Sequence, residues 1–333
     1  MTNENLFEKN GLYPVVTNSS TNNGVTGYTN LLPTEKGNMI TYSDTTTSDG
    51  IFYQPTDYVG YSHIQGLYPL IYKEKWKYKS LMYIVTCFRK VASGRFDYGN
   101  KFNRNIAKEI LIQLPTKDGE IDFEFMDAYI SELEEERISE LSAYLTVSGL
   151  DNYELSSEEK EALENLELVQ WEEYNLEKLF GKSTRGKRLK SDDRINGSLP
   201  FVTAGEANTG ISDFIGNKVE VFSKNTITID MFGSAKYRNY NYGGDDHIAV
   251  VHTEKIKSES AIFVTSAVHK SSYNGQFNYG RNFYAKDADA LNIMLPTKNN
   301  EIDFSYMELL ISAVKKLVIK DVVLYADNKI NAT

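Results

Sequence analysis

Apolar and polar positions change their spacing twice along the chain, in the same way each time. Short alternating runs such as 38–42 (NMITY) and 225–229 (NTITI), interrupted by Gly, Asn, Asp and Pro, predict β-strands joined by turns. Farther along, apolar residues recur at intervals of mostly three and four, which predicts a long amphipathic helix after each β-rich region. These helices are expected over residues 123–148 and 304–327.

An internal repeat explains why the pattern recurs. LPTKDGEIDFEFM at 114–126 returns as LPTKNNEIDFSYM at 295–307, with nine of thirteen residues identical at an offset of 181. FDYG at 96–99 returns as FNYG at the same offset, and the segment 13–25 returns at an offset of 186. The sequence therefore predicts two copies of one unit that differ in loop length.

We expect an α+β fold of two duplicated β-rich globules, each followed by a long helix. The expected divisions are a first globule at 1–122, a helix at 123–148, a connector at 149–170, a second globule at 171–303, a helix at 304–327 and a tail at 328–333. Within the connector, SSEE at 156–159 is a capping-box signature and predicts a short helix.

The apolar seams of the two long helices would both be buried if the helices paired as an antiparallel coiled coil. Packing of each seam against its own globule is the alternative. The residues expected at the helix interface are Ile130, Leu133, Ile138, Leu141, Ile311, Val314, Val318 and Val322.

The distribution of charge changes the first impression of the surface. With 36 Lys+Arg against 46 Asp+Glu, the 333-residue chain carries −10, which taken alone argues against a polyanionic partner. Residues 118–140 carry −9 and residues 151–178 carry −8, however, which leaves +7 for the rest of the chain. The acidity belongs to the first helix and the connector, and the two globules together are basic.

Two basic foci lie in the second globule. Six Lys and Arg residues crowd the segment 182–194, and 236–242 (KYRNYNY) interleaves cations with aromatic and amide side chains. Such side chains neutralise phosphates, stack on bases and hydrogen-bond base edges. A solvated loop is the alternative interpretation of the cation cluster.

Motifs for catalysis and metal binding are absent from the sequence. Cys87 is the only cysteine, and the four histidines show no spacing typical of a metal site. The sequence has no GxxxxGK[ST] loop, no GxGxxG, and no adjacent prolines, which the Asn-Pro-Pro-aromatic motif of amino-methyltransferases requires. The segment 245–247 (DDH) is interpreted as a turn rather than an acid/base cluster. We therefore expect a binding protein without catalytic residues, cofactor or metal.

Neither a membrane span nor a signal peptide is predicted. No stretch approaches the roughly 18 apolar residues that a span requires, and the start MTNENLFEKN lacks the basic and then apolar layout of a signal. A cytoplasmic chain with no membrane contact is therefore expected.

The repeated globule-and-helix units, the LPTK…EIDF block and the early TNSS…NNG segment resemble the DNA-specificity subunits of type I restriction-modification systems over nearly the whole chain. The resemblance implies that each globule is a target-recognition domain that reads one half of a bipartite site in double-stranded DNA. It also implies that the helices set the spacing and dock N6-adenine methyltransferase subunits. Methylation, S-adenosylmethionine and cleavage then belong to partner chains, including a restriction or translocase subunit. Type IIB specificity subunits are similar, and the sequence does not separate the two.

The resemblance also implies three groups of DNA-contacting residues. The early loop, assigned mainly to fold support with phosphate contact as a second role, contributes Thr17, Asn18, Ser19 and Asn22. The base-reading loops contribute Thr45, Thr46, Thr47, Ser48, Tyr61 and His63 in the first copy, and Lys236, Tyr237, Arg238, Asn239 and Tyr240 in the second. The phosphate contacts are Lys101, Arg104, Lys182, Arg185, Lys187, Arg188 and Arg281.

The first copy departs from the pattern near its start. LFEK at 6–9 matches LFGK at 179–182 at an offset of only 173, which predicts that the first copy lacks about thirteen residues, the basic cluster among them. Alternatively, the chain begins inside the unit. A Tyr-rich adhesion or carbohydrate-binding module and a scaffold that has lost recognition are the rival functions.

Overall fold

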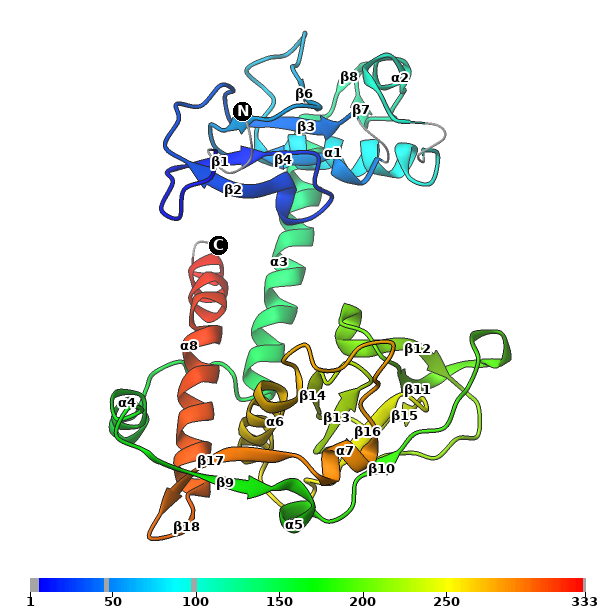
Figure 1. Cartoon of the computed structure of the whole chain (residues 1–333). Coiled ribbons are helices and arrows are strands. Elements are labelled where there is room, and N and C mark those ends of the chain that lie inside the picture. The colour runs from blue at the N-terminus through cyan, green and yellow to red at the C-terminus, as the bar shows by residue number, and fades with distance from the viewer. Residues whose placement is uncertain (1–5, 45–47, 97–100, 332–333) are drawn as a thin grey trace. The chain divides into compact units, whose positions relative to one another are not determined.

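Figure 1 shows a computed structural model of the chain, which describes residues 6–44, 48–96 and 101–331. The chain divides into two compact units. Unit 1 comprises residues 1–143 and 329–333, and unit 2 comprises residues 144–328. The two long helices cross this division, because each begins in one unit and ends in the other.

In its described residues, unit 1 has two three-stranded sheets and a two-stranded hairpin. Its strands are β1 (Tyr13–Val16), β2 (Val25–Thr29), β3 (Met39–Ser43), β4 (Phe52–Gln54), β5 (Val59–Gly60), β6 (Ile64–Leu67), β7 (Thr116–Lys117) and β8 (Glu120–Ile121). Its helices are α1 (Tyr78–Ala92), α2 (Arg104–Glu109) and most of α3 (Phe123–Val147). The strand orders are β2-β1-β5, β4-β3-β6 and β7-β8.

Unit 2 contains a four-stranded sheet and two three-stranded sheets in its described residues. Its strands are β9 (Gln170–Asn175), β10 (Thr184–Arg185), β11 (Asn196–Val202), β12 (Ile211–Ile215), β13 (Thr226–Asp230), β14 (Ala235–Arg238), β15 (Gly243–Gly244), β16 (Ile248–Val251), β17 (Asn292–Lys298) and β18 (Glu301–Ile302). Its helices are α4 (Ser157–Glu164), α5 (Leu176–Phe180), α6 (Ser258–Ser272), α7 (Ala285–Asp289) and most of α8 (Phe304–Ile330). The strand orders are β12-β11-β15, β10-β16-β13-β14 and β18-β17-β9.

The two units share one topology. β1 pairs antiparallel with β2 and parallel with β5, and β11 pairs in the same way with β12 and β15. The order β4-β3-β6 recurs as β14-β13-β16, with β10 added at the outer edge of β16. Strand pairing therefore confirms the predicted duplication, and the added edge strand of unit 2 comes from the basic segment.

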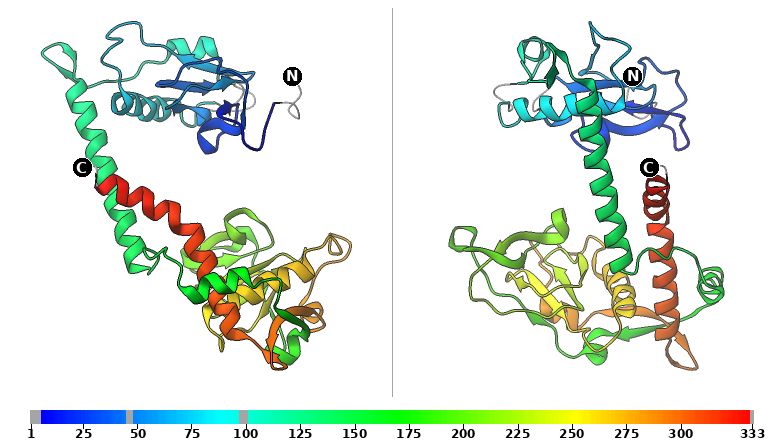
Figure 2. Two further views of the ribbon diagram at one scale, coloured as in Figure 1. Left: turned by 90° about the vertical axis from the view of Figure 1, so that its left-hand side faces the viewer. Right: turned by 180° about the vertical axis from the view of Figure 1, so that it is seen from behind.

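Each unit also contains a 15-residue helix that the alternating pattern did not predict. In α1, Leu81, Val85, Phe88 and Ala92 recur at spacings of four and three and are buried against Ile40 and Tyr42 of β3. The equivalent helix α6 lies against β13, β14 and β17 (Figures 1 and 2). Each globule is therefore a small sheet covered by a helix rather than purely β-structure.

The LPTK…EIDF block is a hairpin that starts a helix. The Asp122 N–H donates to the Pro115 carbonyl at 2.9 Å, and the Asp122 carboxylate accepts from the Phe125 N–H at 2.9 Å. Asp303 makes the equivalent two bonds in the second copy at the same distances. The turn residues with positive φ are Asp118, Gly119, Asn299 and Asn300. The block thus combines a turn that needs Asn, Asp or Gly with a helix cap that needs Asp.

The helix start expected in the connector agrees with the structure, whereas the second long helix ends later than expected. Ser156 and Glu159 form the predicted capping box, with bonds of 2.8 Å and 3.2 Å, at the start of α4. The tail was expected from residue 328, but α8 continues to Ile330. Helix ends are the least sharply defined parts of a helix, so the expected boundary differs from the observed one by a few residues.

The match between LFEK and LFGK is not a structural equivalence. Leu6 is buried with Val15 and Val59 in the first sheet of unit 1. Leu179 and Phe180, by contrast, pack against the main core of unit 2. The two leucines therefore have different environments, and the shortening of the first copy stays a prediction.

One buried polar side chain joins the two strand layers of each unit. In unit 1, Gln54 Nε2 donates to Thr41 Oγ1 of β3 at 2.9 Å and to the Asn23 carbonyl, between β1 and β2, at 3.0 Å. In unit 2, Arg238 Nε donates to Thr228 Oγ1 at 2.9 Å, and its Nη1 reaches Thr209 Oγ1 at 3.4 Å.

The registers make these two side chains equivalent. Gln54 lies opposite Met39, the first residue of β3, and Arg238 lies opposite Thr226, the first residue of β13. The residue before each is also equivalent, because the hydroxyls of Tyr53 and Tyr237 each donate to the side chain of an asparagine with positive φ, Asn38 or Asn225. We call Gln54 and Arg238 the braces of their units, since each ties one sheet to the other.

We predict that Arg238→Ala lowers the free energy of unfolding by about 2–4 kcal/mol, because it leaves buried hydrogen-bonding groups unpaired and opens a cavity. Asn239→Ala is the matched control, since Asn239 is the exposed neighbour and its loss should change stability by less than about 0.5 kcal/mol. Urea denaturation followed by circular dichroism measures both variants. Equal stability of the two variants would contradict the role of Arg238 as a brace.

Candidate nucleic-acid interface

The basic segment of unit 2 is held in place by a backbone contact that only glycine allows. A Cβ on Gly186 would lie 2.2 Å from the Gly244 carbonyl oxygen, which is far inside van der Waals contact. The Gly186 N–H donates to the Ile248 carbonyl at 3.1 Å, and the Lys187 N–H donates to the Gly244 carbonyl at 2.9 Å. The chain therefore runs along the turn between β15 and β16. Its exposed cations are Lys182, Arg185, Lys187, Arg188 and Lys190.

The turn at Asp245–His247 orders two of these arginines. Asp246 lies 3.3 Å from Arg185 and 3.7 Å from Arg188, and the Arg185 guanidinium also donates to the Asp246 carbonyl. His247 Nδ1 lies 3.2 Å from Asp246. The side chains of Asp245, Asp246 and His247 could together offer ligand atoms to a cation. The arginines already balance the carboxylate of Asp246, however, so the turn is better explained as the anchor of the basic segment.

A second loop brings further cations to Arg185. The Arg185 guanidinium lies 5.5 Å from the ring centroid of Tyr284, which is within the range of a cation–π contact. Tyr284 lines a hollow of about 430 Å³ together with Arg281, Asn282 and Lys286. Among the described residues, Asn282 Oδ1 is buried without a hydrogen-bond partner. The predicted residues Arg185 and Arg281 are therefore brought to one basic surface, which we call the β10 corner.

Sequence reasoning missed Asn282, Tyr284 and Lys286 at this corner. The signal was present, because residues 278–286 (NYGRNFYAK) interleave amides, aromatics and cations as 236–242 does. Only the fold shows that the segment 278–286 lies beside the basic strand β10.

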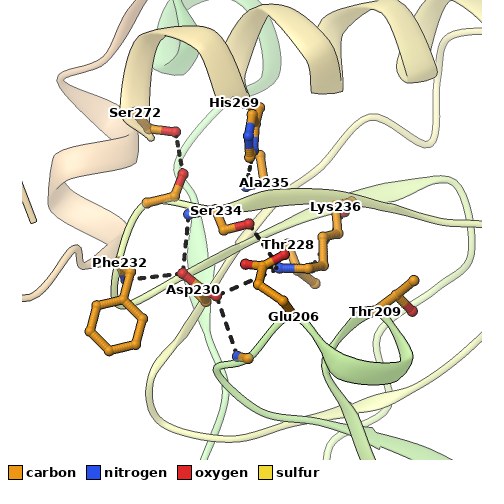
Figure 3. Close-up of polar contacts among 12 residues, drawn as sticks. Glu206, Thr209, Thr228, Asp230, Phe232, Ser234, Ala235, Lys236, His269 and Ser272 are labelled. Carbon is orange, nitrogen blue, oxygen red and sulfur yellow. Dashed lines mark hydrogen bonds and ion pairs between the residues drawn. The ribbon is translucent and has the colours of Figure 1, made fainter. Parts of the chain in front are cut away.

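The segment 236–242, expected to read bases, is largely committed to contacts within unit 2. Lys236 pairs with Glu206 at 3.1 Å and with Asp230 at 3.6 Å, as Figure 3 shows. Burial alone would raise the pKa of Glu206, but hydrogen bonds from Ser234 and Lys236 outweigh that effect and hold the pKa below its usual value. Lys236 therefore carries a charge that its neighbours already balance.

The side chain of Arg238, expected to read bases, is buried. It is only 1% exposed, and its guanidinium donates to the Tyr240 hydroxyl at 2.8 Å in addition to the two threonines of the brace. The expectation that Arg238 reads bases was wrong, because the register of β14 turns its side chain into the unit. Tyr237 is bonded to Asn225, as described above, which leaves Asn239 as the exposed member of the five expected base readers.

Unit 1 has an equivalent corner. The Tyr61 N–H donates to the Val16 carbonyl at 2.9 Å, as the Asp245 N–H does to the Val202 carbonyl. The predicted residues Tyr61 and His63 therefore occupy the same turn as Asp245–His247 in unit 2. We call this turn of unit 1 the β6 corner.

A chain of polar contacts joins the predicted residues at the β6 corner. His63 Nδ1 lies 3.0 Å from Asp44 Oδ1, and Gln65 Nε2 donates to Asp44 Oδ2 at 3.0 Å. Arg104 Nε in turn donates to Gln65 Oε1 at 2.8 Å. Because Gln65 is neutral, the charge of Arg104 is not balanced by this contact. His63, exposed and with a φ of +70°, and Arg104 are thus brought together by residues that sequence reasoning missed.

Other predicted residues of unit 1 have different placements. Thr45, Thr46 and Thr47 lie outside the described residues, directly after Asp44, and Ser48 begins a short 3₁₀ turn. Lys101 is exposed in the segment before α2. These contact assignments stay predictions.

The early TNSS…NNG loop mainly supports the fold. Asn22 and Asn23 take positive φ, and Asn23 Nδ2 donates to the Tyr53 carbonyl at 2.7 Å. The Thr17 N–H donates to the Gly24 carbonyl at 2.8 Å, while Ser19 bonds within the loop. Asn18 is exposed. Asn suits these positions because it tolerates the left-handed conformation better than most residues.

The expected helix-interface residues differ in exposure. Ile130 is buried, whereas Leu133, Val314 and Val322 are about 40% exposed and Val318 is 74% exposed. The remaining residues, Ile138, Leu141 and Ile311, are half-buried. Antiparallel pairing of the two helices stays a prediction. No helix in the described part of the chain is both long and apolar enough to cross a membrane.

Comparison with known proteins matches the same two regions. The model of the type I restriction modification DNA specificity domain matches residues 1–143 and 169–323. The "Type II restriction enzyme BgcI specificity subunit S.BcgI" of Heyndrickxia coagulans is 25% identical over 232 residues, which span 68% of this chain and 64% of that protein. The match thus covers less than two thirds of that relative.

A solved structure shows the same fold. The type I restriction-modification S subunit from M. genitalium superimposes with a TM-score of 0.52 at 17% identity, over 100% of this chain and 88% of that chain. Because the family model covers most of the sequence in two blocks that correspond to the duplicated units, the chain belongs to the type I restriction modification DNA specificity domain family.

Proposed function

We propose that the protein is a non-catalytic DNA-recognition subunit of a restriction-modification complex, in which each unit contacts one half of a bipartite site in double-stranded DNA. The observation that carries the proposal is the pair of equivalent corners. Both units bring cations close to the turn that precedes β6 or β16, although from different elements. Arg104 of α2 bonds to Gln65 of β6, and Arg185 and Arg188 of the basic segment pair with Asp246. Two equivalent cationic corners suit a partner that presents phosphates at two separated positions.

In this proposal the long helices set the separation of the half-sites and bind N6-adenine methyltransferase subunits. Exposed apolar side chains such as Val318 and Leu317 on α8 are available for such contacts. Those partners bring S-adenosylmethionine and carry out methylation, and a restriction or translocase subunit carries out cleavage. No catalytic role is assigned to residues of this chain.

A type II arrangement is the second candidate. The specificity subunit from Heyndrickxia coagulans is described as part of a type II restriction enzyme. In that arrangement the partner fuses methyltransferase and nuclease, while DNA recognition by this chain is unchanged. Purification of the chain with its partners distinguishes the two, because a single fused partner subunit replaces separate ones.

The rival functions make different demands on the corners. A carbohydrate-binding module would use exposed aromatics such as Tyr279, which is 85% exposed at the hollow of the β10 corner, and would not need the neighbouring cations. A scaffold that has lost recognition does not need the cations of the β10 corner. The two experiments below therefore test DNA contact directly.

We predict that replacing Arg185, Arg188 and Arg281 together by Ala weakens binding of the partner-bound complex to its DNA site and reduces its salt dependence. The slope of log K against log salt should become shallower by up to nearly three, because each phosphate that is no longer neutralised removes roughly 0.9 from it. Fluorescence anisotropy at several salt concentrations, with a duplex that carries the site found by sequencing methylated host DNA, measures this change.

Arg137→Ala is the matched control for this triple variant. Arg137 is as exposed as Arg188, at 59% against 60% of the side chain, but it lies on α3 between Glu136 and Glu140. The control should keep the original slope and affinity, provided that copurification verifies its assembly with the partners, which α3 is proposed to contact. A triple variant that behaves like the control, while still folded by circular dichroism, would favour the scaffold function.

We also predict that the spacing of the two half-sites is read geometrically. Inserting about 5 base pairs between them turns one half-site by roughly half a helical turn relative to the other, so that both corners can no longer face the duplex together. Binding by the complex should fall to the level of a duplex with one half-site. Retained affinity for the lengthened site would contradict recognition by two units at a fixed separation.

A further inference from the structure

In unit 2, the segment 170–180 packs against residues 291–296, which are the counterpart of residues 110–115 in unit 1. In unit 2, β9 pairs antiparallel with β17, with Tyr174 opposite Ile293 and Glu172 opposite Leu295. The Leu176 N–H then donates to the Leu291 carbonyl at 3.0 Å, and Leu176 is only 1% exposed. The strand and the short helix α5 thus cover the edge of β17 and help to close the core.

The equivalent residues of unit 1, 110–115, precede β7 without forming a strand, and they have no such cover among the described residues. At the offset of 181 defined by the repeated block, residues 110–115 correspond to 291–296. β7 pairs with β8 alone, whereas β17 lies between β18 and β9. Among the described residues, no hydrogen-bond donor reaches the Ile110 carbonyl, the counterpart of the Leu291 carbonyl that accepts from Leu176.

The side chains along this edge are apolar and partly exposed. Ile112 and Leu114 are half-buried, whereas their counterparts Ile293 and Leu295 are 1% and 0% exposed. Leu111 is 87% exposed. This stretch therefore presents hydrophobic surface to water, which a partner strand could cover.

A hollow lies beside this edge. It has a volume of about 540 Å³, and its apolar lining comes from Val91 of α1, Ile106 of α2, Ile110 and Leu111. The α1–α2 region of unit 1 corresponds to the α6–α7 region of unit 2, where α5 packs against α7. Residues 110–115 and the hollow together offer a surface for a strand followed by an apolar residue. We call this surface the β9-like seat.

We propose that the β9-like seat of unit 1 binds an extended segment of a partner polypeptide, which adds to residues 110–115 as an antiparallel strand and places a leucine-type side chain in the hollow. Such strand addition uses backbone hydrogen bonds for affinity and alternate side-chain pockets for specificity. The template is the chain's own residues 170–180, which show the sequence type that covers the equivalent edge in unit 2. The proposal does not depend on DNA recognition.

A second copy of the chain is a poorer occupant than a separate partner. The segment that fits the seat, residues 170–180, is already paired with β17 of its own unit through six residue pairs, from Asn175–Asn292 to Gln170–Thr297. Its removal would expose the edge of β17 and the buried side chain of Leu176. An exchange between copies thus uncovers one edge for each edge that it covers.

The test uses the full-length chain and a synthetic peptide of residues 169–183 as the probe. Hydrogen exchange measured by mass spectrometry should show slower exchange in residues 110–115 when peptide is added, by about tenfold at a peptide concentration ten times the Kd. A peptide with Leu176→Gly should give much weaker protection, because it brings no side chain to fill the apolar part of the hollow.

Matched variants of the chain test the location of the peptide. Leu111→Asp should abolish the protection, whereas Leu70→Asp should leave it unchanged, since Leu70 is also 87% exposed in unit 1 but is not among the lining residues of the hollow. Both substitutions are at exposed positions, so neither should unfold the unit. Circular dichroism confirms this point before the exchange experiment.

Three results would overturn the proposal. The first is unchanged exchange in residues 110–115 at millimolar peptide. The second is protection confined to 292–298, which means that the peptide has displaced β9 in unit 2. The third is self-association of the chain that Leu111→Asp removes and Leu70→Asp does not, because a second copy would then be the occupant.

Discussion

The architecture of each unit depends on a buried polar side chain that joins two of its sheets. Gln54 and Arg238 each connect a threonine of the central strand, β3 or β13, to the turn between the first two strands of the other sheet. The turn itself takes positive φ, so its carbonyl and side-chain groups point where a strand could not place them. With these two sheets fixed in this way, the turn before β6 or β16 has one position in each unit. His63 lies on this turn in unit 1, Arg104 contacts the strand that follows it, and Arg185 and Arg188 contact the turn in unit 2.

The duplication separates structural residues from candidate recognition residues. Contacts that occur in both units, such as the two braces and the hydroxyls of Tyr53 and Tyr237, hold the shared framework. Features that occur in one unit, such as β10 with Gly186 against Gly244, distinguish the two units. A protein whose two units recognise different half-sites needs this combination of a shared framework and different surfaces.

Acidic and basic residues are concentrated in different parts of the chain. Residues 118–140 and 151–178 together carry −17 and the rest of the chain +7, while the β10 corner gathers exposed cations near one carboxylate, Asp246. That carboxylate orders two arginines without balancing the whole cluster. The corner can therefore stay positively charged and still hold its side chains in place, which suits contact with phosphates.

The sequence by itself determined the duplication, the two long helices, the short helix after Ser156 and the helix-starting role of the EIDF block. Each of these depends on residues close together in the chain, where a cap or a turn has one local solution. It also identified Arg185, Arg281, His63 and Arg104 as candidate contacts, although it could not show that they meet in pairs at equivalent corners. Those groupings depend on strand pairings between distant segments.

Only the tertiary structure decided which basic and aromatic segments face outward. Residues 236–242 and 278–286 have the same mixture of cations, aromatics and amides, yet Arg238 is a buried brace while Arg281 lines an exposed hollow. The side chain of an arginine can satisfy a buried threonine and tyrosine or a phosphate with the same hydrogen bonds. Strand register, which alternates side chains between the two faces of a sheet, makes the choice between them.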